Sequence, residues 1–142
     1  MFTFFPECKP IPDTDIVSFI VCSNGYGHIK RVISVVNEIN FIDKNIKTII
    51  FINKTHLKFL RASSNFKINE PERVVLKTTL SEFEPLWNKN LSFKLYQSWN
   101  KKLSKNKFIN KSDLIISDNY ISPLGVLNNV ILMGSFLWID IE

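Results

Sequence analysis

Short apolar runs alternate with segments of helical periodicity along the chain. The first run, residues 15–23 (DIVSFIVCS), is almost continuously apolar and is bounded by proline and glycine, as expected for a strand buried on both faces of a parallel sheet. Four later segments carry a strand signature: 46–53, 73–78, 113–118 and 130–133. The pattern therefore predicts five strands.

Helical spacing appears between these runs. Apolar side chains recur after the first run with polar residues on the opposite side, at Ile29, Val32, Ile33, Val36 and Ile39. A short helix is predicted over 55–62. A longer one is predicted over 87–107, with a stripe of Leu91, Leu95, Trp99 and Leu103 and a lysine-rich wet face. Strands alternating with helices predict an α/β domain, an open parallel sheet of about five strands with helices on both faces.

The 142 residues fit one domain, 1–142, with a single core. The chain stops shortly after the fifth predicted strand, and it is still apolar through Phe136, Leu137 and Trp138. An open α/β sheet needs both faces covered. We therefore expect either a longer architecture, completed by a second domain or a partner chain, or a terminal segment that packs back onto the sheet.

Charge and composition narrow the classes of partner. The net charge of +5 comes almost wholly from lysine and permits an anionic partner, although a lysine-, asparagine- and isoleucine-rich chain also fits AT-rich coding. With only three arginines and no recognised module, nucleic acid is not expected. No run approaches the roughly 18 apolar residues of a membrane helix. Two cysteines without metal-ligand spacing, Cys8 and Cys22, indicate a cytoplasmic protein and no metal site.

Two polar clusters follow predicted strands. One comes directly after the first strand and opens the first helix: Asn24, Gly25, Tyr26, Gly27 and His28. The other follows the fourth strand: Asp118, Asn119 and Tyr120. Ligands of open parallel sheets bind beyond the carboxyl ends of the strands. We therefore expect the two clusters to share one crevice.

The first cluster has the features of an anion site. Its glycines allow a sharp turn and a close approach of ligand, and a helix N-terminus offers free N–H groups. Lys30 and Arg31 oppose the helix dipole there, by roughly 0.3–1 kcal/mol each, and a bound phosphate or carboxylate would reverse that sign. Lys30 stands where the dinucleotide fingerprint requires glycine, and no G-K-[ST] occurs, so no nucleotide cofactor is expected.

His28 is the natural base near neutral pH, and Asp118 could orient it if the two strand ends are neighbours. The alternative is that His28 caps the helix start and Asp118 caps a turn. His56 lies between Lys54 and Lys58 and is expected at the surface. The leucine and tryptophan stripe is expected in the core, with a peripheral membrane contact as the alternative for its lysine-rich face.

The strand followed by NGYGHIKR, with DLIISDN about ninety residues later, resembles the N-terminal domain of GT-B glycosyltransferases, a Rossmann-like domain. It is also similar to nucleotide-sugar hydrolases with a G-x-G-H-x-x-R motif, here Gly25 to Arg31. The resemblance covers nearly the whole chain in element order, but only the two loops are specific.

The resemblance implies catalytic roles for His28 as base and Asp118 as its orienter. It implies substrate-binding roles for the surrounding loop residues, Asn24, Gly25, Tyr26, Gly27, Lys30, Arg31 and Asn119. The implied substrates are a nucleotide-sugar donor and a sugar or lipid-linked acceptor, with inversion at the sugar. The usual donor domain is missing from these 142 residues. Hydrolysis of a nucleotide sugar, or a non-catalytic binding module, are the alternatives.

Overall fold

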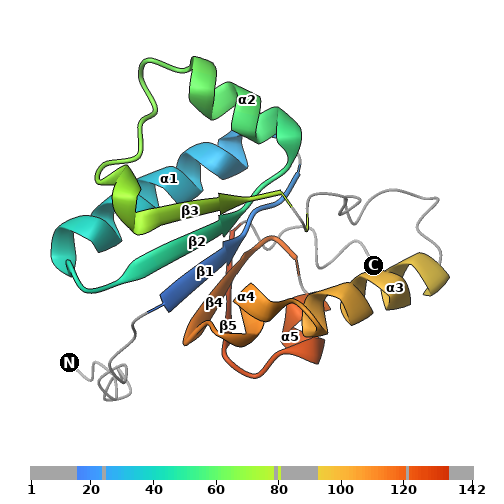
Figure 1. The fold of residues 1–142 in the computed structure, drawn as a ribbon. Coiled ribbons are helices and arrows are strands. Elements are labelled where there is room, and N and C mark those ends of the chain that lie inside the picture. Colours follow the sequence, from blue (N-terminus) through green and yellow to red (C-terminus); the bar gives the residue numbers. More distant parts are fainter. Residues whose placement is uncertain (1–15, 24, 79, 81–92, 121, 135–142) are drawn as a thin grey trace, which may run out of the picture.

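A five-stranded, all-parallel sheet forms the centre of the computed structural model, which describes residues 16–23, 25–78, 80, 93–120 and 122–134 (Figure 1). The strand order is β3-β2-β1-β4-β5. The strands span Ile16–Ile20 (β1), Lys47–Phe51 (β2), Val74–Lys77 (β3), Leu114–Asp118 (β4) and Val130–Met133 (β5). The predicted fold class, a Rossmann-like open parallel sheet, is confirmed.

Helices cover both faces of the sheet (Figure 1). On one face lie α1 (Gly25–Ile42) and α2 (Lys54–Ala62). On the other lie α3 (Phe93–Ser104), α4 (Lys107–Asn110) and α5 (Ser122–Val126). A 3-10 turn, η1 (Pro71–Arg73), leads into β3. No helix in the described parts of the chain is long and apolar enough to cross a bilayer.

Strand β1 lies at the centre of the sheet, and its side chains belong to two hydrophobic cores, one on each face. Val17 and Phe19 are buried in the cluster beneath α1, whereas Ile20 and Cys22 are buried in the cluster that contains Trp99 of α3. Successive side chains of a strand point to opposite faces. A continuously apolar strand is therefore what a sheet covered on both sides requires.

The neighbours of β1 determine where the two polar loops meet. β1 pairs with β2 on one side, Ile20 opposite Phe51, and with β4 on the other, Ile20 opposite Ser117. The chain order reverses between β1 and β4, which makes their carboxyl ends the topological switch point of the sheet. The loops after β1 and β4 therefore start side by side.

The helix predicted over 87–107 differs from the one observed. Residues 87–92 lie outside the described residues, and α3 ends at Ser104. Asn106 then starts α4, because its Oδ1 accepts hydrogen bonds from the backbone N–H of Phe108 (2.9 Å) and Ile109 (3.2 Å). Trp99 and Leu103 are buried as predicted, while Leu91 and the side chain of Leu95 lie outside the described residues.

Two further points concern the end of the chain. Helix α5 was not predicted, although Pro123 near its start is compatible with a first helical turn, where a missing N–H costs nothing. The apolar residues Phe136, Leu137 and Trp138, for which two kinds of packing were expected, lie outside the described residues.

Candidate functional site

The candidate site lies where α1 begins, beside the carboxyl ends of β1 and β4. Gly25 opens the helix with φ of +59°, a left-handed backbone conformation that glycine adopts without strain. Three residues later His28 lies in the first turn of α1, and Arg31 follows one turn on. Residues three apart are neighbours on a helix surface, so these two side chains share one face.

Asp118 is the meeting point of these side chains. It is the last residue of β4 and is fully buried. Its Oδ2 lies 2.8 Å from Nδ1 of His28, and its Oδ1 accepts a hydrogen bond of 2.5 Å from Nη2 of Arg31. The exposed fractions of the side chains are 0% for Asp118, 18% for His28 and 37% for Arg31. The structure thus brings His28 and Asp118 together as the sequence predicted, and adds Arg31.

The buried carboxylate changes the protonation of His28. The hydrogen bond that His28 donates to Asp118 raises the pKa of His28 from 6.5 to about 9, the nearby Cys22 thiol adds to this, and burial opposes it. At neutral pH the ring is therefore an imidazolium whose Nδ1–H donates to Asp118. Arg31 Nη2 lies 3.1 Å from that nitrogen. His28 and Arg31 therefore both donate to the Asp118 carboxylate, each to a different oxygen. The cluster carries two positive charges and one negative charge.

Gly134, which was not predicted as a site residue, lies directly after β5 and borders this cluster. It has φ of +133°, and a Cβ there would lie 1.7 Å from Oδ1 of Asn119 and 3.2 Å from Nη2 of Arg31. The backbone of Asn119 is also in the left-handed conformation, with φ of +61°, and its N–H donates to the carbonyl of Met133 (2.9 Å). The available signal was a glycine ending the fifth predicted strand at the same edge of the sheet.

His56 is buried, so the prediction of a surface residue is wrong. Its Nε2 lies 2.8 Å from the carbonyl oxygen of Gly25 and donates to it. Burial lowers the pKa of His56, which keeps the ring neutral. The flanking Lys54 and Lys58 are exposed, but residues two apart on a helix lie on different faces. Charged neighbours in sequence therefore do not indicate where His56 points.

Asn53 and His56 together tie α2 to the first loop. Asn53 Oδ1 accepts from the backbone N–H of His56 (2.7 Å) and caps α2, while Asn53 Nδ2 donates to the carbonyl of Ser23 (3.2 Å). Tyr120 fixes the same loop from the β4 side, since its hydroxyl accepts from the Ser23 backbone N–H (3.0 Å) and lies 3.2 Å from Ser23 Oγ. Asn53 and His56 at the start of α2, and Tyr120 just after β4, thus hold the loop in place.

The remaining residues of the predicted site are distributed differently. Lys30 lies with Nζ 4.8 Å from the ring centroid of Phe66, rather than on the Asp118 cluster, and Tyr26 stacks on Phe59 with centroids 4.5 Å apart. Gly27 is exposed at the helix start, and a Cβ added there would meet no atom within 4 Å. Asn24 lies outside the described residues.

Neither a metal-binding cluster among the described residues nor a similar protein indicates what this site does. Within the described ranges, no group of three or more His, Cys, Asp or Glu side chains is placed to hold a metal ion. Comparison with protein-family models, with curated proteins and with solved structures gives no match. The geometry of His28, Arg31 and Asp118 is therefore the evidence for the chemistry of the site.

The raised pKa can be tested on the isolated chain. In an NMR titration the ring protons of His28 should shift with a midpoint near pH 9, whereas Asp118→Asn should lower the midpoint, because the largest cause of the raised pKa is then removed. His56 is the internal control, with a midpoint below 6.5 in both proteins. An unshifted His28 in the wild-type chain would contradict the assignment.

Gly134 offers a second test. Gly134→Ala should lower the free energy of unfolding by about 1–3 kcal/mol, since φ of +133° is strained for alanine and its methyl group would displace Asn119. Gly125→Ala in α5 is the matched control, because nothing lies within 4 Å of its Cβ position. Urea denaturation of both variants measures the difference, and equal stabilities would show that Gly134 is not conformationally required.

Proposed function

We propose that the chain is the acceptor-side half of an enzyme that transfers a sugar from a nucleotide-sugar donor, similar to the N-terminal domain of a GT-B glycosyltransferase. One observation carries the proposal. A histidine at the mouth of α1 is held 2.8 Å from a fully buried aspartate, at the switch point of an open parallel sheet. A base oriented by a carboxylate, at the edge where such sheets bind ligands, suits deprotonation of a hydroxyl group.

The orientation of His28 assigns its nitrogens. Nδ1–H stays hydrogen-bonded to Asp118, so Nε2 is the nitrogen that takes the proton. As the acceptor oxygen forms its bond to the anomeric carbon, the bond from that carbon to the donor phosphate breaks. The electron pair leaves with the nucleoside diphosphate. Asp118 stabilises the imidazolium that results, and a single in-line displacement inverts the configuration.

The charge state of the free site makes this base dependent on pH. With a pKa of about 9, His28 is protonated in most molecules at pH 7 and must lose its Nε2 proton before it can act. Arg31 offsets part of the Asp118 charge and so favours the neutral ring. An anionic ligand that draws Arg31 away would compete with Asp118 for the guanidinium.

The other parts of the enzyme follow from the same proposal. The nucleotide-sugar donor would be held by a second domain or a partner chain, and the acceptor would be a sugar or a lipid-linked sugar. Gly25, Gly27 and Asn119 would shape the loop edges around these substrates, with Arg31 as the candidate phosphate contact. We also propose a cytoplasmic location, where nucleotide sugars are available, and no cofactor.

One observation favours a second candidate function. At neutral pH the imidazolium of His28 and the guanidinium of Arg31 lie together near the N-terminus of α1, with a single carboxylate between them. Such a cluster attracts anions whether or not a reaction is catalysed. A binding module for a phosphorylated ligand is therefore the alternative, and it predicts binding without turnover.

The two candidates separate in a kinetic experiment on the full-length enzyme, or on this chain with its complementary domain. His28→Gln should lower kcat/KM for sugar transfer by about 10²–10⁴-fold, the usual contribution of a general base, and wild-type kcat/KM should rise with pH toward 9. Lys44→Gln, in an exposed turn, is the control. Release of nucleoside diphosphate should be measured with and without acceptor, which also separates transfer from hydrolysis. Unchanged kcat in His28→Gln would remove His28 from the reaction.

A further inference from the structure

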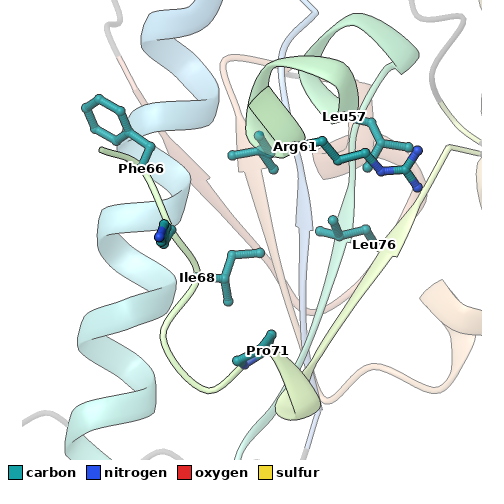
Figure 2. A pocket seen from close by; sticks show the side chains of 8 residues that line it. Leu57, Arg61, Phe66, Ile68, Pro71 and Leu76 are labelled. Atoms are coloured by element: carbon teal, nitrogen blue, oxygen red, sulfur yellow. The ribbon is translucent and has the colours of Figure 1, made fainter. Parts of the chain in front are cut away.

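An open cavity of about 410 Å³ lies away from the Asp118 cluster, between α2, the segment leading to η1, and β3 (Figure 2). Its walls are formed by Leu57, Leu60, Arg61, Phe66, Lys67, Ile68, Pro71 and Leu76. None of these residues belongs to the His28, Arg31 and Asp118 cluster. The volume lies in the range of small-molecule sites, roughly 300–1,000 Å³.

The interior of the cavity is apolar and incompletely covered. Leu57, Leu60, Ile68 and Leu76 pack against the core beneath α1, yet each keeps part of its surface exposed. Figure 2 shows Leu76, Ile68 and Pro71 arranged along the hollow that opens below α2. Apolar surface that faces an open cavity is free to be buried by a ligand, at roughly 25 cal/mol per Å².

The polar side chains of the lining are both cations. Arg61 lies in the last turn of α2 and Lys67 in the following segment, and both are exposed. Among the described residues neither forms an ion pair, and the lining contains no acidic residue. The nearby Glu70 is already paired with Arg73 at 2.6 Å. The cavity therefore combines an apolar interior with two uncompensated positive charges.

Phe66 forms a fixed wall at one side of the cavity. Its ring packs against Phe59, with centroids 6.3 Å apart, and the Lys30 ammonium lies 4.8 Å from its centroid. These contacts hold the ring and add a third positive charge close to this wall. They also give Lys30 a place in the structure that does not depend on the Asp118 cluster.

We propose that this cavity binds a single-chain amphiphilic anion from solution, with its alkyl tail against the leucines and Ile68 and its carboxylate or phosphate head at one of the two cations of the lining, Arg61 or Lys67. An apolar peptide would leave the two cations uncompensated. A bilayer would contact a protruding surface rather than enter a hollow. The proposal does not depend on the function proposed for His28.

Calorimetric titration of the wild-type chain with decanoate tests the proposal. Decanoate should bind with a stoichiometry of one, and octanoate should bind more weakly by about fourfold for each methylene removed. The double variant Arg61→Gln/Lys67→Gln should weaken decanoate binding by up to about fivefold, since the head group then lacks a cation to pair with. Lys58→Gln, an exposed cation of the same helix outside the lining, should bind as the wild type does.

Two further measurements fix the place and the source of the ligand. NMR should show shifts at the methyl groups of Leu57, Leu60 and Ile68 on addition of decanoate, and none at the ring protons of His28. Decan-1-ol, which lacks the charge, should bind the wild-type chain about as weakly as decanoate binds the double variant. The protein should not sediment with phosphatidylcholine vesicles that contain phosphatidylglycerol. The proposal would be overturned by a lack of saturable binding, by an equal loss of binding in Lys58→Gln, or by shifts confined to the His28 ring. Equally tight binding of the alcohol, or sedimentation of the protein with the vesicles, would also overturn it.

Discussion

The carboxylate of Asp118 is the constraint around which this edge of the sheet is arranged. A fully buried carboxylate is costly unless it is paired and hydrogen-bonded, and Asp118 receives both compensations from one helix, through His28 and Arg31. For α1 to supply them, its first turn must start directly beside β4. Gly25 makes that start with a left-handed backbone, and Gly134 leaves the space that Arg31 and Asn119 occupy.

The two histidines lie on either side of the same loop and are shifted in opposite directions. The hydrogen bond to Asp118 raises the pKa of His28, whereas burial lowers the pKa of His56, whose ring donates a hydrogen bond to the Gly25 carbonyl. One histidine is thus charged and the other neutral over the physiological range. The first is suited to exchange a proton at its partly exposed ring, and the second is suited to hold the loop.

The local features of the fold could be predicted from the sequence, because they depend on short-range patterns. The uninterrupted apolar run of β1 and the spacing of α1 indicated a doubly covered parallel sheet. The contact of His28 with Asp118 was predicted on the condition that their strands are neighbours, and the pairing of β1 with β4 meets that condition. The features that the sequence did not indicate depend on tertiary partners. His56 was placed at the surface because of its lysine neighbours, yet the Gly25 carbonyl that it contacts lies 31 positions away. Arg31 was predicted as a substrate-binding residue, and its pairing with Asp118, 87 positions away, was not predicted. No periodicity records such contacts, and the catalytic role of His28 stays a prediction.

The pH dependence of the unfolding free energy tests the central claim, that the folded structure holds His28 protonated on Asp118. Because the folded pKa of about 9 exceeds the unfolded value of 6.5, the pair contributes stability that is fully present below pH 6.5 and is lost as pH rises through 9. The account predicts that wild type loses up to about 3 kcal/mol relative to His28→Gln over this range, measured by urea denaturation. His56, with its lowered pKa, acts on the acid side of 6.5 and cancels in the comparison. Parallel curves for the two proteins from pH 6.5 to 9 would contradict the account.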